Sequence, residues 1–153
     1  MTTNDCMMEV TPGEVWSVLA DGWLYPLWVV GATRVRGVDA DWPAHGSQIH
    51  HSVGVWPAVI NDTTEVLETE PEHLLRLRAR AWPGGEAEVV IRLTAVGPGS
   101  QVTIEEDAVS GPGALVPKPL RAGTIKWRNV ESLRRLKMIA EGRAVQQTST
   151  AGS

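Results

Sequence analysis

The residues of this chain best suited to proton transfer are His51, Asp62 and Glu106. His51 and Asp62 belong to two β-rich segments joined at Trp56-Pro57, and pairing across that turn sets their side chains opposite each other. A carboxylate beside an imidazole fixes its tautomer and raises its basicity, as a general base for enolisation or cyclisation requires. The same pair is equally compatible with a structural hydrogen bond, because the sequence places no nucleophile beside it.

Glu106 falls on the apolar face of a later β-rich segment, where the expected pairing sets it opposite Ile91. A carboxylate in apolar surroundings must be paired, hydrated or protonated. Glu106 could orient a ligand hydroxyl, transfer a proton, or anchor a residue of the C-terminal helix. The expected partner in that helix is Lys126 or Asn129, with Arg128 close behind.

The other chemistry-bearing residue types predict neither a metal site nor a cofactor. His45, His50, His51 and His73 have no paired spacing on one face, and His50 and His51 point to opposite sides of a strand. The single cysteine, Cys6, has no base near it in sequence and suits a small buried hydrophobic position. The glycine-rich loops follow strands without opening a helix, so no nucleotide-binding pattern is present.

Periodicity and turn residues predict the elements that position these side chains. Thr11-Pro12-Gly13-Glu14 forms a capping box that predicts a helix over 12-20, and a second short helix is expected over 23-30. A short strand is expected at 5-10. Alternation of apolar and polar residues predicts six further strands, near 32-39, 47-54, 57-69, 74-82, 86-96 and 101-110. Their short connectors favour an antiparallel meander.

Residues 120-142 have the period of a long helix, with an apolar stripe predicted at Ala122, Trp127, Val130, Leu133, Leu136 and Ala140. Gly142 is the expected end of this helix. Residues 1-142 are then expected to form one domain, and 143-153 a disordered tail. One long helix available to cover one sheet predicts an α+β fold, in which a curved antiparallel sheet of about seven strands wraps around the C-terminal helix.

Diffuse motifs accompany this order of elements: Val15-Trp16-x-x-Leu19-x-Asp21, Tyr25-Pro26-x-Trp28, Glu105-Glu106-Asp107 before Gly111-Pro112, and Arg128-Asn129-x-Glu131-x-Leu133-x-x-Leu136. Over residues 5-142 the chain resembles the SRPBCC superfamily. That group includes START lipid-transfer domains, the birch-pollen-allergen fold and polyketide cyclase/dehydrase proteins. The resemblance implies a helix-grip fold with a hydrophobic cavity between the sheet and the long helix.

Residues expected to face that cavity are the candidate ligand contacts. The chain has seven Trp, one Tyr and no Phe, and Trp28 and Trp127 are the indoles that the pattern directs inward. Ordinary core packing is the competing interpretation for both. The full candidate ligand-binding set is Trp28, His51, Thr64, Leu77, Ile91, Glu106, Trp127 and Val130.

Charge and hydropathy limit the partners. Fourteen Lys and Arg against eighteen Asp and Glu give a net charge of -4, and no basic run is interleaved with aromatics, which argues against nucleic acid. No segment approaches the ~20 apolar residues of a membrane helix, and the N-terminus is acidic where a signal peptide is basic. We therefore expect a cytoplasmic protein without integral membrane association.

These features predict binding or transport of a hydrophobic small molecule, such as a lipid, polyketide or aromatic metabolite, by a monomer or homodimer. The alternative is an enzyme similar to polyketide aromatase/cyclases, in which His51, Asp62 or Glu106 moves protons during ring closure. A third possibility is a protein-interaction module that uses the outer face of the sheet or the tail.

Overall fold

The computed structural model describes residues 2–30, 32–53, 60–81, 85–111, 115 and 117–151. The expected α+β architecture is confirmed, with a sheet, two short helices after the first strand and a long C-terminal helix. The turns expected at Trp56-Pro57 and Pro83-Gly84 lie outside the described residues. In chain order the elements are β1 (Thr2–Met8), α1 (Pro12–Leu19), the 3-10 helix η1 (Gly22–Leu24), α2 (Tyr25–Trp28), β2 (Ala32–Val38), β3 (Gln48–Val53), β4 (Ile60–Glu70), β5 (Leu74–Ala81), β6 (Gly85–Val96), β7 (Gly99–Ser110) and α4 (Lys118–Ala151).

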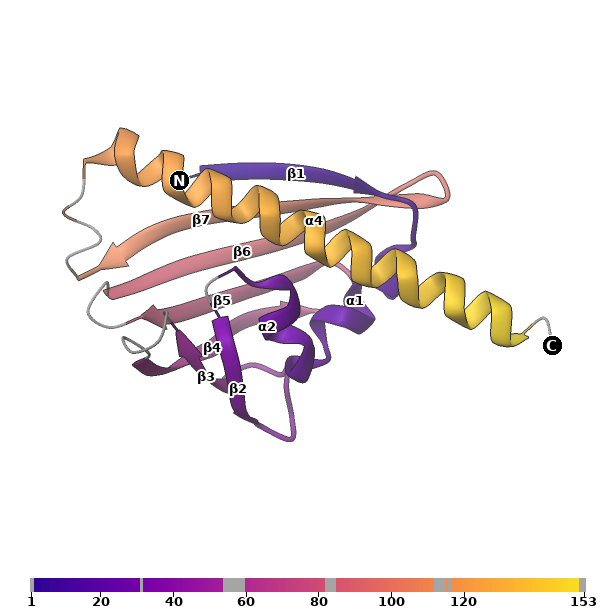
Figure 1. Cartoon of the computed structure of the whole chain (residues 1–153), viewed down its shortest axis with the longest axis horizontal. Helices are drawn as coiled ribbons and strands as arrows, with labels where there is room; N and C mark the ends of the chain where they lie inside the picture. The colour runs from indigo at the N-terminus through magenta and orange to yellow at the C-terminus, as the bar shows by residue number, and fades with distance from the viewer. Residues whose placement is uncertain are drawn as a thin grey trace.

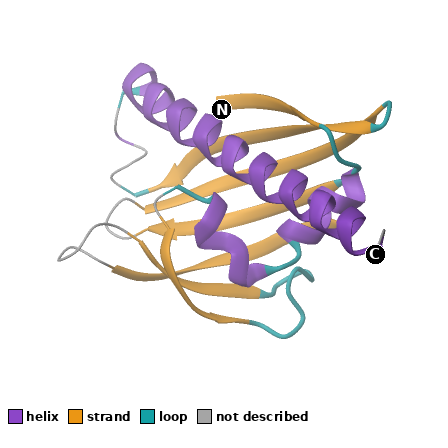
Figure 2. Cartoon of the chain, turned by 45° about the vertical axis from the view of Figure 1, so that its right-hand side comes forward, coloured by secondary structure: helices purple, strands orange, loops and turns teal. Residues whose placement is uncertain are grey.

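The seven strands form one antiparallel sheet in the order β1-β7-β6-β5-β4-β3-β2. Strands β2 to β7 are a meander, and β1 completes the sheet by pairing with β7. Helix α4 runs diagonally across one face of this sheet, with α1 and α2 beside it on the same face (Figures 1 and 2). Strand alternation sends the charged residues of β5 and β6 to the other face, where Arg76 pairs with Glu88 and Arg80 with Glu86.

The β6–β7 register differs from the expected one by two residues. Glu106 pairs with Val89, whereas the sequence predicts Ile91 as its neighbour. The hairpin closes through the two-residue turn Gly97-Pro98, with Gly97 at a φ of 54°, a conformation that favours glycine. Because a shift of two preserves alternation, every side chain keeps its expected face, and Glu106 still points toward α4.

The short helices follow from local capping. The Oγ1 of Thr11 accepts from the backbone N–H of Glu14 at 3.2 Å, and the Glu14 carboxylate accepts from the N–H of Thr11 at 3.0 Å, which confirms the capping box. Asp21 then caps η1 by accepting from the N–H of Trp23. Pro26 lies in the first turn of α2, where its missing N–H costs nothing. This arrangement holds Tyr25 and Trp28 buried beside the sheet.

The long helix extends further than its sequence pattern indicates. α4 continues through Gly142 to Ala151, so the predicted helix end is wrong, and residues 143–151 are helical where disorder was expected. A glycine inside a helix costs about 1 kcal/mol relative to alanine, which neighbouring Ala, Arg and Gln residues offset through their high helix propensity.

The apolar core lies between the sheet and the middle and C-terminal parts of α4, where α1 also packs. Its fully buried members include Val15 and Val18 of α1 and Leu136 of α4. The indole N–H of Trp42 donates to the carbonyl of Leu19 at 3.1 Å, which satisfies the ring nitrogen in this core. The interior beside the N-terminal half of α4 is not filled in the same way.

Candidate functional site

A cavity of about 430 Å³ lies between the sheet, α2 and the N-terminal half of α4. The strands contribute small and aliphatic walls, and short side chains leave open space where α4 crosses the sheet. Rings of α2 form another wall. The apolar lining includes Tyr25, Trp28, Ala32, Leu77, Ala79, Ala87, Val89, Ile104, Ala108 and Ile125.

His51 of β3 lies in this wall and is 3% exposed. Its Nε2 lies 2.8 Å from the hydroxyl oxygen of Thr64, and that oxygen lies 3.1 Å from the hydroxyl of Tyr25. The Tyr25 ring stacks on the imidazole with centroids 5.5 Å apart, and its other neighbour is Trp28 in an edge-to-face contact at 5.6 Å. Stacking and hydrogen bonding together fix the orientation of the imidazole.

The surroundings of His51 favour its neutral form. Burial lowers the pKa of His51, the Asp62 carboxylate opposes that effect, and the Arg36 guanidinium adds to it. Burial also raises the pKa of Tyr25, so its phenol keeps its proton at neutral pH. The second ring nitrogen of His51, Nδ1, is buried without a hydrogen-bond partner among the described residues. Such an atom is costly unless a ligand or water satisfies it.

The predicted pairing of His51 with Asp62 is confirmed for the backbone, since the two residues are opposite each other on β3 and β4. Their side chains do not form the expected hydrogen bond. The imidazole Nε2 is bonded to Thr64, a diagonal cross-strand neighbour on the same face, and Asp62 Oδ1 accepts from the backbone N–H of Thr63 at 2.8 Å. Asp62 is not part of the cavity wall, whereas His51 is.

Glu106 and Arg128 form an ion pair at another wall of the cavity. The Glu106 side chain is 5% exposed and that of Arg128 is 39% exposed, so the pair runs from the interior to the surface. Of the three residues considered from sequence, Arg128 is therefore the partner. Lys126 is exposed, and Asn129 is buried in the wall.

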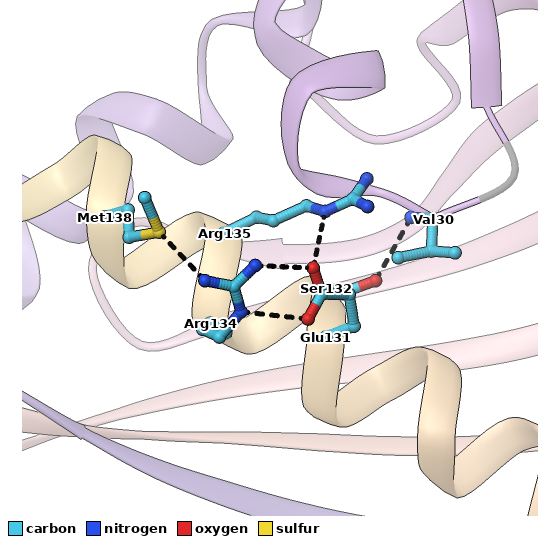
Figure 3. Close-up of polar contacts among 6 residues, drawn as sticks. All are labelled: Val30, Glu131, Ser132, Arg134, Arg135 and Met138. Atoms are coloured by element: carbon cyan, nitrogen blue, oxygen red, sulfur yellow. Dashed lines mark hydrogen bonds and ion pairs between the residues drawn. The ribbon is translucent and has the colours of Figure 1, made fainter.

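Asn129 and Ser132 of α4 also line the cavity, as does Thr124. Asn129 is 4% exposed, and its amide nitrogen has no hydrogen-bond partner within the described parts of the chain. One turn further, Ser132 accepts from the backbone N–H of Val30 at 3.2 Å and ties α4 to the segment after α2 (Figure 3). Among the described residues, the cavity wall thus carries two buried nitrogens without partners, Nδ1 of His51 and Nδ2 of Asn129.

The predicted ligand contacts divide into three groups. Trp28, His51, Leu77 and Glu106 line the cavity. Thr64 and Ile91 are buried but are not among the lining residues, and Thr64 connects to the cavity through the side chains it bonds. Trp127 and Val130 are 67% and 51% exposed on α4, which contradicts the prediction that they face the cavity.

The error at Trp127 has a geometric cause. The inner face of α4 includes Ile125 and Asn129, and Trp127 is two residues from each, which is about 200° around the helix. Polar residues occupy inner positions next to the cavity, so the apolar pattern assigned the first half of the helix to the wrong side. The sequence did contain a signal for the correct inner face. Ile125, Asn129 and Leu133 are spaced four residues apart, which places them on one side of a helix.

Sequence reasoning also missed Tyr25 as a site residue. It is the only tyrosine of the chain, and its hydroxyl and ring both contact the polar groups of the cavity. Its position in the same short helix as Trp28, a predicted ligand contact, could have identified Tyr25. Its bond to Thr64, 39 positions away, depends on the tertiary fold.

Other kinds of site find no support in the described part of the chain. Within it, no three His, Cys, Asp or Glu side chains gather as metal ligands would. None of the described helices is long and apolar enough to cross a membrane. The thiol of Cys6 is free and partly buried, and burial raises its pKa.

Comparison with known proteins gives a family and a fold. A family model described as polyketide cyclase / dehydrase and lipid transport matches residues 4–141. No curated protein matches the chain. Among solved structures, protein NE0264 from Nitrosomonas europaea is 17% identical with a TM-score of 0.73, over 94% of this chain and 95% of that one.

Two other solved structures have the same fold. Ara h 8.0201 is 10% identical with a TM-score of 0.70, over 92% of this chain and 96% of that one. The di-domain ARO/CYC StfQ from the steffimycin biosynthetic pathway is 11% identical with a TM-score of 0.73. That match covers 93% of this chain and 50% of StfQ.

Proposed function

The chain belongs to the polyketide cyclase/dehydrase and lipid-transport family of the SRPBCC superfamily, and from that premise we propose that it binds a hydrophobic small molecule bearing carbonyl or hydroxyl groups. The observation that carries the proposal is an apolar cavity of about 430 Å³ in whose wall two buried nitrogens, His51 Nδ1 and Asn129 Nδ2, have no partner in the described parts of the chain. Apolar walls favour hydrocarbon or aromatic rings. The two nitrogens favour a ligand that supplies oxygen atoms.

The shape of the site supports a planar or ring-containing ligand. The rings of Tyr25 and Trp28 form one wall, and flat side chains of this kind stack on flat ligands. Arg128 reaches from the paired carboxylate of Glu106 toward solvent, so its remaining N–H groups are available to a polar substituent at the entrance. Among lipids, polyketides and aromatic metabolites, an oxygenated aromatic polyketide meets both requirements best.

A second candidate function, cyclase-like catalysis, is favoured by the state of His51. A neutral imidazole accepts a proton from the carbon next to a ketone, which is the first step of an aldol closure. The bonds to Thr64 and Tyr25 would hold the ring in place for that step. Asp62 no longer belongs to the candidate set, because it is not part of the cavity wall.

Binding is tested by titrating the protein with medium-chain fatty acids and with hydroxyanthraquinones, following tryptophan fluorescence and melting temperature. A ligand of the cavity should change the fluorescence and raise the melting temperature. Ala87→Phe fills the cavity and should abolish both effects. Ala95→Phe is the matched control, since Ala95 lies on the same strand but is exposed outside the cavity. If neither ligand class affects the wild-type protein, the proposal fails.

Catalysis is tested separately with a poly-β-ketone thioester mimic. An enzyme should form the aromatic product, and His51→Gln should lose turnover while retaining binding. A wild-type protein that binds the mimic without converting it is a carrier. Leu77→Met serves as the comparison, because it changes the cavity wall at a residue that cannot transfer a proton.

A further inference from the structure

The outward side of α4 carries large apolar side chains in solvent. Leu120, Trp127, Met138 and Val145 are 68%, 67%, 60% and 66% exposed. At 3.6 residues per turn they fall within about 20° of one another around the helix, directly opposite the buried face. They form one straight stripe along α4, which is called the outer stripe below.

Two glycines flank the outer stripe. A side-chain carbon added at Gly123 or Gly142 would meet nothing within 4 Å, so no contact within the described chain calls for glycine there. Each glycine still costs about 1 kcal/mol of helix stability relative to alanine. Their places become understandable if another chain approaches this side of the helix.

On this side of α4, the large apolar residues, the glycines and the charged residues are arranged symmetrically about a point between Ser132 and Leu133. A two-fold axis through that point, perpendicular to α4, sets each residue of one helix against its counterpart in an antiparallel second copy. The counterparts are Leu120 and Val145, Gly123 and Gly142, Trp127 and Met138, and Glu131 and Arg134.

We propose that two copies of this chain form a homodimer through antiparallel packing of their outer stripes. Trp127 of each copy then contacts Met138 of the other, and thioether sulfur contacts aromatic rings favourably. Gly142 of the second copy lies one turn from that Met138 and leaves room for the indole. Leu120 and Val145 close the contact at each end.

Charge complementarity selects this arrangement over a parallel one. Within one chain, the Arg134 guanidinium donates to Glu131 at 2.8 and 2.9 Å and lies 3.4 Å from the sulfur of Met138 (Figure 3). The hydrogen bonds from Arg134 and Arg135 lower the pKa of Glu131 to about 2, so it is charged at neutral pH. Antiparallel pairing sets Glu131 against Arg134 of the second copy twice, whereas parallel pairing sets like charges together.

The dimer brings the second copy to the cavity entrance. Leu120 belongs both to the outer stripe and to the cavity lining. Its counterpart, Val145, lies in the C-terminal turns of α4 that extend beyond the strands (Figure 1). In the dimer these turns cover part of the entrance of the other copy.

Sedimentation and light scattering over a range of protein concentrations test the dimer. The wild type should approach twice the 16.6 kDa mass of the chain. Trp127→Glu buries an unpaired charge in the contact and should raise the dimer dissociation constant about 30-fold or more. Met7→Glu is the matched control, because Met7 is 51% exposed on the face of β1 that points away from α4. Circular dichroism verifies that both variants fold.

Charge exchange and cross-linking test the antiparallel geometry. Glu131→Arg and Arg134→Glu should each weaken the dimer, and their combination should restore it. In a Cys6→Ser background, Trp127→Cys chains mixed with Met138→Cys chains should form a mixed disulfide on mild oxidation. Trp127→Cys alone should not cross-link, because its two copies lie about 16 Å apart along the helices.

Four results would overturn the proposal. A wild-type chain that stays monomeric at all concentrations excludes the dimer, as does a dimer unaffected by Trp127→Glu. Self-cross-linking of Trp127→Cys indicates a parallel contact. If the monomer instead binds phosphatidylcholine vesicles and Trp127→Glu abolishes that binding, the stripe meets a membrane surface rather than a second copy.

Discussion

The two sides of α4 reverse the usual distribution of apolar and polar side chains on a helix that covers a sheet. Its inner side carries Arg128, Asn129 and Ser132 beside the cavity, and its outer side exposes Trp127 and Met138. A helix selected only to cover a core places apolar residues inward and polar residues outward. Buried polar residues and exposed apolar residues both lower the stability of the isolated chain. Such a loss of stability is common where a surface serves binding. The inner reversal coincides with the proposed ligand site, and the outer one with the proposed contact between copies.

The reversal stops where the cavity stops. Further along the same inner side, Leu133, Leu136 and Ala140 are buried in the core. The N-terminal half of α4 therefore has an inner face that lines the cavity, and the middle has an inner face that packs in the core. Substitutions on the different faces of α4 test this division, because each face should affect a different property of the protein.

Leu136→Ala should give the largest loss of stability. Leu136 is fully buried, and removing its side chain from a packed core costs about 4 kcal/mol in the free energy of unfolding. Met138→Ala, two residues away on the outer side, should cost less than about 0.5 kcal/mol in dilute protein. Urea denaturation of both variants checks the comparison. Equal losses would mean that the outer side is part of the fold of a single chain.

Arg128→Ala should be next in size. Glu106 is 5% exposed, and losing its partner leaves a buried carboxylate uncompensated, at a cost of about 3 kcal/mol. The double variant Arg128→Ala with Glu106→Gln should recover most of that loss, because the unpaired charge is then gone. A double-mutant cycle by urea denaturation measures the coupling. Additive effects would show that the pair is not coupled in the fold.

Strand alternation and turn chemistry made most of the fold predictable. The capping box at Thr11, the strand order and the pairing of His51 with Asp62 all follow from local patterns, because alternation fixes a strand's faces and a short turn fixes its register. The β6–β7 register was off by two because Gly97-Pro98-Gly99 allows more than one turn. Both registers keep the same face inward, so the sequence could not separate them.

The site was less predictable because its residues violate the pattern used to find it. Asn129 lies where an apolar residue is expected, and Trp127 lies where a polar one is expected, so a single apolar stripe could not be correct for both. The contact between Tyr25 and Thr64 joins a short helix to a distant strand, and only the folded chain brings them together. The pairing of Glu106 was narrowed to three residues but not decided, since all three lie within four positions of one helix.

Asn129→Leu should stabilise the protein while weakening ligand binding. The amide nitrogen is buried without a partner among the described residues, and an apolar side chain of similar size removes a penalty of about 1.5 kcal/mol. The gain in melting temperature and the loss of affinity for a bound hydroxyanthraquinone are measured on the same sample. A variant that is less stable would show that Asn129 serves the fold rather than the ligand site.

Acid should destabilise the folded chain through His51. The folded pKa lies below the usual value of 6.5, so the unfolded chain takes up a proton that the folded one refuses as pH falls through 6.5. Stability is therefore complete above that pH and declines below it, until the folded pKa is reached. Urea denaturation at pH 7.5 and pH 5.5 should show a smaller difference for His51→Gln than for the wild type. An unchanged difference would assign the acid sensitivity to other groups.

Gly142→Ala should have the smallest effect and the most specific one. In the separate chain the substitution adds helix propensity without a clash, which stabilises α4 by about 0.8 kcal/mol. In the dimer the added methyl group occupies space that the proposed contact gives to Trp127 of the second copy, so the dissociation constant should rise. The melting temperature at low protein concentration should therefore rise, whereas sedimentation at high concentration should show a smaller fraction of dimer. Gln147→Ala is the control, because Gln147 is exposed on α4 and lies about 180° around the helix from Leu120 of the outer stripe. If Gly142→Ala strengthens both the fold and the dimer, the glycine is not there to admit a second chain.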